Sequence, residues 1–267
     1  PSFFVAPLRL TPVSFTDLAR HFEYTEVKIS PDGKYLAAVS VVKDQHVLAL
    51  LRLSDEQGRI LHPRQGDDVL DFWWASPGRV VYTVGTHVGG IDRPLSTGEL
   101  FAVSADGGDA EMLYGYRKGG MTTGTLIKHA VSARGTAEFI ASIPGDPRHA
   151  LVSISSWDAA GSQRYLSQAE RIDLQNGNLE PIISAPGRGM SFVADHQGRI
   201  RFAYGEDDAG DIKVYLHPVD GEGWQEMPNV EPSRSTPLAF NRTDSLVYFT
   251  CSPKDGGFGI CTWNPHT

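Results

Sequence analysis

The sequence predicts an all-β fold, a β-propeller built of four-stranded antiparallel blades. A pair of apolar strands around a Ser-Pro-Asp-Gly turn, clearest at residues 27–39, recurs in four weaker copies. A second hairpin with a Gly-containing turn follows each of the first four copies, so a complete repeat supplies four strands. The Ser-Pro-Asp-Gly turn and its weaker copies recur roughly 45 to 68 residues apart, and propeller blades span about 40 to 50 residues.

The first hairpin has a local chemical cause. Val27 and Ile29 alternate with polar residues, as in a half-buried strand. Pro31 then presets φ, the Asp32 side chain can bond its own backbone, and Gly33 accepts a positive φ. The run at 35–39 that follows is too apolar to face water on either side. This stretch therefore predicts a strand, a tight turn and a more buried strand.

Five repeats follow from these patterns, with an N-terminal extension before them. We place the extension at residues 1–23, with a short helix at 14–22, and the repeats at about 24–66, 67–128, 129–186, 187–232 and 233–267. The last repeat is partial, with three evident strands. Residues 3–10 could supply its fourth strand and close a small ring, or the segment could be an open arc. Residues 86–98 are expected to form a long hairpin tip, and residues 116–128 a flexible connection.

Composition and charge exclude several kinds of partner. The chain has 267 residues, 40% hydrophobic and 21% charged, and a net charge of −8. Without a basic cluster, nucleic acid and anionic membrane surfaces are not expected partners. No apolar run approaches the roughly 18 residues that span a bilayer. Because Pro1 is not a translation start, we expect a processed form or a segment of a longer protein.

The sequence lacks the motifs of a catalytic, cofactor or metal site. A nucleophile elbow needs Gly-x-Ser-x-Gly, and the nearest match, around Ser191, lacks the second glycine and is interpreted as an ordinary inner strand. No P-loop, His-Glu-x-x-His or Cys-x-x-Cys occurs. Residues 206–211 concentrate acidic side chains that could hold calcium, but a solvated hairpin tip is the favoured interpretation. We therefore expect no catalytic residue, cofactor or metal in this chain.

Several segments resemble a known family. Residues 15–20, 27–38, 144–152, 172–177 and 194–201 resemble the amino-terminal propeller of bacterial prolyl-oligopeptidase-family serine peptidases. The acylaminoacyl-peptidase and dipeptidyl-aminopeptidase-like branch is the most similar, and the resemblance extends over nearly the whole chain. In that family a propeller of seven or eight blades precedes an α/β-hydrolase domain with the catalytic serine, aspartate and histidine. The resemblance implies that this chain is an incomplete, open arc and that the hydrolase lies outside it.

The function implied by this resemblance is that of a non-catalytic domain. We expect this chain to be the propeller of a serine peptidase that hydrolyses peptides or acyl-aminoacyl compounds. In this role the propeller admits only short peptides to the active site. The implied partners are the C-terminal α/β-hydrolase domain of the same parent chain and short peptide substrates. The alternative is a free-standing propeller that acts as a protein–protein interaction scaffold. A Gly-x-Ser-x-Gly motif beyond residue 267, followed by Asp and His, would distinguish the two.

The two cysteines, Cys251 and Cys261, flank a predicted hairpin loop rich in Pro, Asp and Gly. If the hairpin is symmetric about Gly256, they face each other with Cα atoms about 4.5 Å apart, near the short end of the disulfide range. Alternatively, they are two small apolar side chains in a reduced, cytoplasmic protein. Gram-negative members of the resembled branch are often exported. Our hypothesis is a cross-strand disulfide in a periplasmic or secreted protein, with a cytoplasmic location as the alternative.

Overall fold

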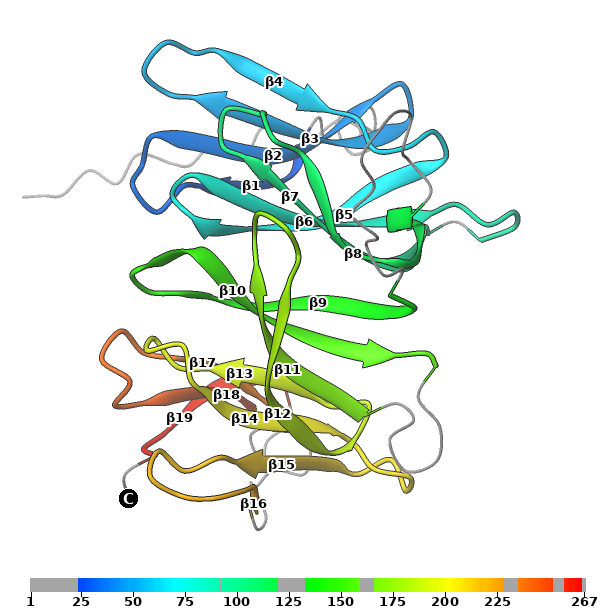
Figure 1. Ribbon diagram of the computed structural model, residues 1–267. Helices are drawn as coiled ribbons and strands as arrows, with labels where there is room; N and C mark the ends of the chain where they lie inside the picture. Colours follow the sequence, from blue (N-terminus) through cyan, green and yellow to red (C-terminus); the bar gives the residue numbers. More distant parts are fainter. Residues whose placement is uncertain are drawn as a thin grey trace, which may run out of the picture.

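The computed structural model describes residues 24–91, 93–119, 133–158, 166–227, 235–251 and 257–265. These residues form five antiparallel sheets, which are the blades of an open propeller (Figure 1). The helix expected at 14–22 and the possible strand at 3–10 lie outside the described residues. No helix within the described part of the chain is both long and apolar enough to cross a membrane.

Each blade is a meander in which consecutive strands pair. Blade 1 contains β1 (Tyr24–Ile29), β2 (Tyr35–Val42), β3 (Gln45–Arg52) and β4 (Gly58–Leu61). Blade 2 contains β5 (Asp67–Ser76), β6 (Arg79–Thr86), β7 (Leu95–Ser104) and β8 (Glu111–Tyr114). Blade 3 contains β9 (Gly135–Ile143), β10 (Asp146–Ser156), β11 (Leu166–Asp173) and β12 (Leu179–Arg188). Blade 4 contains β13 (Ser191–Ala194), β14 (Ile200–Glu206), β15 (Ile212–Leu216) and β16 (Gln225–Glu226). Blade 5 has three strands, β17 (Pro237–Phe240), β18 (Val247–Cys251) and β19 (Gly259–Trp263).

Side-chain hydrogen bonds fix the first hairpin. The Ser30 hydroxyl donates to Asp32 Oδ1 at 2.7 Å and accepts from the backbone amides of Lys34 and Tyr35 at 3.1 and 3.0 Å. Gly33 takes φ +72°, which a residue with a Cβ rarely adopts. The predicted pairing of the flanking strands is confirmed, since Ile29 lies opposite Leu36.

Four apolar cores join the blades in sequence order. Each core combines one face of a blade with the facing side of the next, from blades 1 and 2 through to blades 4 and 5. Phe72 and Phe202 are fully buried in such cores. Because burial of one large apolar side chain contributes about 1.5–3 kcal/mol, these junctions hold the arc together.

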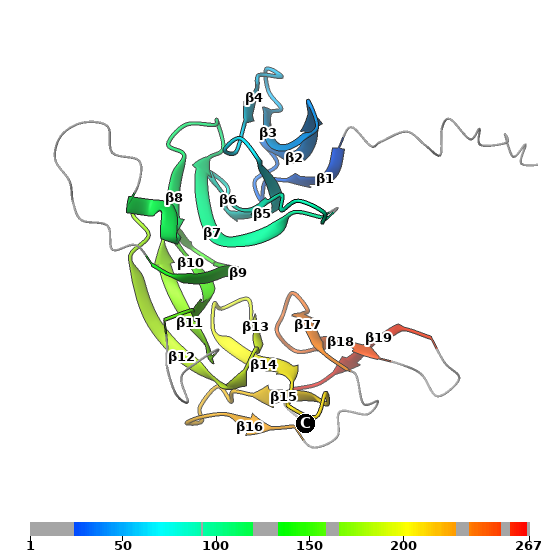
Figure 2. The ribbon, with the colours of Figure 1, turned by 90° about the vertical axis from the view of Figure 1, so that its right-hand side faces the viewer.

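The blades do not close into a ring. Figure 2 shows blades 1 and 5 at the two ends of an arc, with the first strand of each blade on its inner side and β4, β8, β12 and β16 on its outer side. The sheets are not closed, so the expectation of an open arc is confirmed.

Two local expectations need correction. The hairpin tip expected at 86–98 is shorter, because Thr86 pairs with Leu95 and extends both strands. The connection expected to be flexible from residue 116 begins with a 3-10 turn, η1 (Tyr116–Gly119), while residues 120–132 lie outside the described part.

Candidate functional site

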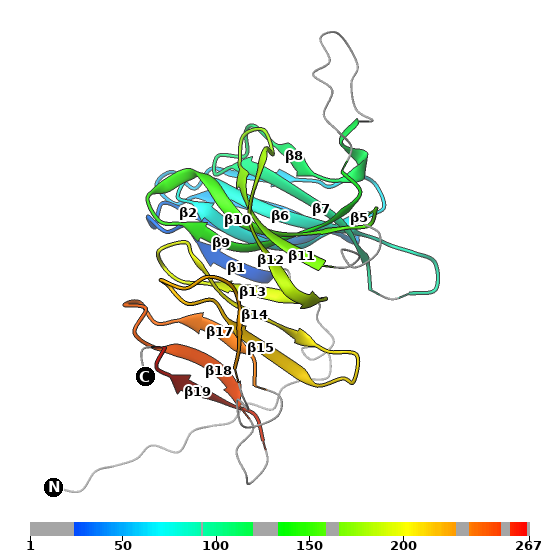
Figure 3. The same cartoon turned by 60° about the horizontal axis from the view of Figure 1, so that its bottom comes forward.

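The arc has two different edges, because antiparallel strands place alternate connections at opposite ends. We call the edge with the short β1–β2, β5–β6, β9–β10, β13–β14 and β17–β18 turns the turn end. The opposite edge, the loop end, carries the connections between blades and the β6–β7 connection, which projects from blade 2 (Figures 1 and 3). Binding residues concentrate on irregular connections held by a rigid scaffold, so the loop end is the first place to search.

A buried ion cluster lies at the loop end of blade 2. Arg117 of η1 donates from Nε to Glu99 Oε1 at 2.6 Å and from Nη1 to Asp67 Oδ2 at 2.8 Å, and its Nη2 bonds to Glu99 Oε2. Glu99 is fully buried, and the Asp67 side chain is nearly so. The hydrogen bonds that Arg117 donates to Glu99, and after them the bond to Asp67, hold the pKa of Arg117 above its ordinary value although desolvation acts to lower it. The cluster fixes the start of the connection between blades 2 and 3.

Glycines make room for this cluster. A Cβ on Gly115, whose φ is +148°, would lie 2.5 Å from Glu99 Cγ. A Cβ on Gly98, at φ +73°, would lie 2.7 Å from the carbonyl oxygen of Gly135, which begins blade 3. Close backbone approach of this kind requires glycine. The loop end of blades 2 and 3 is therefore a closely packed platform.

A second carboxylate at this edge joins blades 1 and 2. Asp68 Oδ2 lies 2.9 Å from both His46 Nδ1 and His87 Nε2, and its Oδ1 accepts the His46 backbone amide at 3.0 Å. Burial acts to raise the pKa of Asp68, but the His46 amide and the two imidazoles outweigh it, and the pKa is lowered. His87 begins the projecting β6–β7 connection, so Asp68 anchors that connection to blade 1.

Exposed aromatic and apolar side chains occur on the loop-end connections of blades 2 and 3. Tyr116 and Trp157 lie with ring centroids 6.0 Å apart, and Trp157 is 46% exposed although its backbone amide and indole donate to Arg134 O and Thr136 Oγ1. The β6–β7 connection adds Val88 and Ile91, both exposed. Large aromatics held in fixed positions are typical anchors of protein interfaces. The loop-end surface, defined by Val88, Ile91, Tyr116 and Trp157, is therefore suited to contact with another folded surface.

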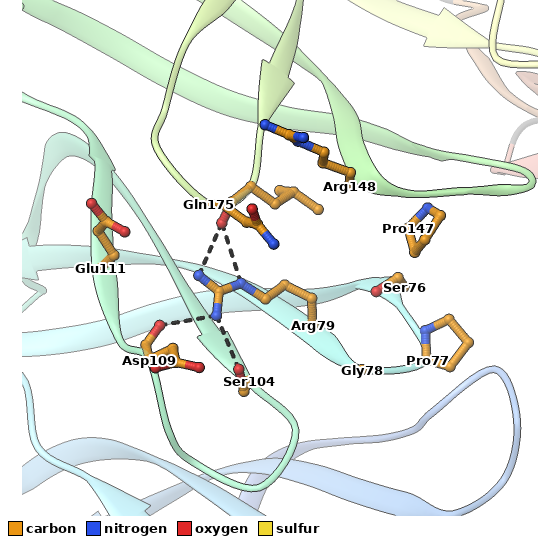
Figure 4. Close-up of a pocket in the computed structure, with 11 residues that line it drawn as sticks. Ser76, Pro77, Gly78, Arg79, Ser104, Asp109, Glu111, Pro147, Arg148 and Gln175 are labelled. Carbon is orange, nitrogen blue, oxygen red and sulfur yellow. Dashed lines mark hydrogen bonds between the residues drawn. The ribbon is translucent and has the colours of Figure 1, made fainter.

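The turn end contains an interblade cleft of about 640 Å³ between blades 2 and 3 (Figure 4). The Arg79 guanidinium crosses it, donating twice to the Leu174 carbonyl of blade 3 at 3.3 and 2.9 Å and also to Ser104 Oγ and Asp109 O of blade 2. Desolvation lowers the pKa of Arg79, and the charges of Asp109 and Glu111 oppose the shift. Since these donors go to groups of the protein itself, Arg79 acts as a tie between two blades.

The structure also locates the residues singled out from the sequence. Ser191 is half-buried at the start of inner strand β13. The Asp207 carboxylate accepts the amides of Ala209 and Asp211, which makes the acidic segment an ordered turn. Within the described ranges, no group of three or more His, Cys, Asp or Glu side chains could hold a metal ion.

The cysteines lie in the predicted hairpin but in a different register. Cys251 pairs with Gly259, and Cys261 with Phe249, so the expectation that the cysteines face each other directly is wrong. They are diagonal neighbours on one face, with Cα atoms 5.9 Å apart and the two sulfur atoms bonded. The distance lies within the usual disulfide range.

Sequence reasoning missed the ion cluster. Its three members are 18 and 50 residues apart in sequence, and no local motif joins them. One signal was present, because Glu99 is the one charged residue of strand β7 and directly precedes its apolar run at 100–103, and a charge buried in a strand needs a partner.

Comparisons with known proteins identify structural neighbours. No protein-family profile matches the sequence, and no curated protein matches it. Among solved structures, the match to uncomplexed acylaminoacyl peptidase of Pyrococcus horikoshii covers 91% of this chain and 38% of the peptidase chain, with a TM-score of 0.55 and 13% identity. The match to the β-propeller domain of the Trilobed protease from Pyrococcus furiosus covers 91% of this chain and 69% of that chain, with a TM-score of 0.54 and 14% identity. The match to a prolyl endopeptidase, from a study of two such enzymes, covers 92% of this chain and 35% of that chain, with a TM-score of 0.57 and 10% identity.

The chain thus spans little more than a third of the acylaminoacyl peptidase and the prolyl endopeptidase. Identities this low establish the fold. The fold of this chain is that of the β-propeller domains of acylaminoacyl peptidase and prolyl oligopeptidase family members.

Proposed function

We propose that this chain is the non-catalytic propeller of a serine peptidase and restricts the active site of an α/β-hydrolase domain to short peptides. The observation that carries the proposal is the match of over nine-tenths of this chain to peptidase chains of which it spans 35–38%. In such neighbours the propeller sits with a hydrolase domain in the same chain. We assign the contact with that domain to the loop-end surface.

Two features of the loop end support this assignment. Trp157 and Tyr116 are exposed aromatics whose ring centroids lie 6.0 Å apart, and exposed apolar groups of this size mark interaction sites. Beneath them, the pairs of Arg117 and Asp68 hold the connections in place. A rigid surface loses little conformational freedom when a partner binds.

The first test is the coding sequence beyond residue 267 in the parent protein. A Gly-x-Ser-x-Gly motif followed by Asp and His supports the proposal, because these residues form the nucleophile elbow and triad of an α/β-hydrolase. A reading frame that continues without them contradicts it and favours the interaction scaffold.

The second test measures gating in the parent protein. Trp157→Ala should weaken the interdomain contact and raise cleavage of a long unstructured peptide relative to a chromogenic dipeptide. Ile182→Ala, at an exposed position on β12, is the control and should leave this ratio unchanged. An unchanged ratio in Trp157→Ala would contradict the assignment of the loop end.

A further inference from the structure

A cavity of about 350 Å³ lies where the β4–β5 connection meets blade 2. Its wall includes a row of side chains on one face of blade 2, because Tyr82 of β6 pairs with Phe101 of β7, and Phe101 pairs with Met112 of β8. The Tyr82 and Phe101 rings stack with centroids 5.2 Å apart. Pro63 and Arg64 of the connection also line the cavity. Cavities of this size hold small organic molecules.

The Tyr82 hydroxyl makes no hydrogen bond with any group in the described part of the chain, although Tyr82 is only 8% exposed. In that same part, every fully buried polar side-chain atom has a hydrogen-bond partner. The Tyr82 hydroxyl therefore keeps contact with solvent, and the cavity is where the otherwise buried side chain can reach it. Burial raises the pKa of Tyr82 to about 12, so at neutral pH the hydroxyl can both donate and accept a hydrogen bond.

The charged side chains of the cavity differ in how they are partnered. Asp67 and Arg117 form an ion pair with each other. Glu111 is exposed, and its negative charge acts on Arg79. Arg64 is also exposed, and it has no ion pair or side-chain hydrogen bond among the residues that the structure describes. A guanidinium in this state can bind a carboxylate through two parallel hydrogen bonds, so the charge at this cavity favours an anionic ligand.

We propose that this cavity binds a small aromatic carboxylic acid that carries a hydroxyl group on its ring. The ring packs against Phe101 and Met112, its hydroxyl bonds to the Tyr82 hydroxyl, and its carboxylate pairs with Arg64. An aromatic ligand is favoured because a ring placed on another ring gains more than the burial of its area alone. The site is independent of the proposed peptidase function, since none of these residues belongs to the loop-end surface.

The test is isothermal titration calorimetry of the full chain with para-hydroxyphenylacetate. Two matched probes each lack one recognised group, because phenylacetate has no ring hydroxyl and tyrosol has an alcohol in place of the carboxylate. Tyr82→Phe should weaken binding of para-hydroxyphenylacetate about two- to tenfold, the effect of one hydrogen bond, and leave binding of phenylacetate unchanged. Arg64→Gln should weaken binding of para-hydroxyphenylacetate about two- to fivefold, the effect of an exposed ion pair, and leave binding of tyrosol unchanged.

Tyr248→Phe is the matched control and should bind all three probes like wild type, since Tyr248 is 38% exposed on β18 of blade 5 and does not line the cavity. Tyr82→Phe should also unfold in urea like wild type, because its hydroxyl has no protein partner to lose. No binding of para-hydroxyphenylacetate at millimolar concentration would overturn the proposal. Binding that is unchanged in both Tyr82→Phe and Arg64→Gln would also overturn it, because the ligand would then lie elsewhere.

Discussion

Arg117→Ala should destabilise the protein by about 3–5 kcal/mol, the usual effect of removing one partner of a buried ion pair. The substitution leaves Glu99, which is fully buried, and Asp67, whose side chain is only 4% exposed, without the guanidinium that bonds to both. Two carboxylates excluded from water then have no counter-charge.

Urea unfolding followed by tryptophan fluorescence measures this loss. Arg134→Ala is the matched control, because Arg134 pairs with Asp158 at 3.3 Å while their side chains are 64% and 60% exposed. An exposed pair contributes at most about 1 kcal/mol, so the control should remain close to wild type. A second variant, Arg117→Ala with Glu99→Gln, removes one of the unpaired charges and should recover part of the loss.

Two results would refute this reasoning. Equal small losses of stability in Arg117→Ala and Arg134→Ala would show that a buried ion pair contributes no more to the stability of this protein than an exposed one. Failure of Glu99→Gln to recover stability in the Arg117→Ala background would show that the loss arises from packing of the Arg117 side chain and not from unpaired charge.

Three further predictions concern acid stability, oxidation and activity. The pKa of Asp68 is lowered, so the ionised carboxylate stabilises the fold above about pH 4, and this stabilisation is lost as the pH falls through the lowered pKa. An acid unfolding curve unchanged by Asp68→Asn would contradict this. We propose that the protein is periplasmic and that thiol labelling of denatured, unreduced material finds no free thiol, whereas two thiols would exclude a Cys251–Cys261 bond. Reduction of the Cys251–Cys261 disulfide should lower the free energy of unfolding in urea by no more than about 3 kcal/mol, since the bond closes a short loop. The isolated chain should not hydrolyse chromogenic peptides or esters, since it has no nucleophile elbow; turnover lost on mutation of one of its serines would disprove this.

The sequence alone predicted the repeated hairpins, because their causes are local. Ser30, Asp32 and Gly33 are adjacent, and they form the turn by bonding to the nearest backbone amides and by adopting a positive φ. Strand alternation likewise depends on neighbouring residues. The same local signals predicted three strands in the fifth repeat, and the described residues of that repeat form a three-stranded sheet.

Tertiary structure alone decided which distant side chains meet. Asp67 and Arg117 are 50 residues apart and come together because β5 and the end of blade 2 reach the same edge of one sheet. The cysteine register was also beyond the sequence, since a hairpin centre displaced by one residue changes directly opposed partners into diagonal ones. Pairing across a loop depends on the whole backbone path, whereas a turn depends on only a few consecutive residues.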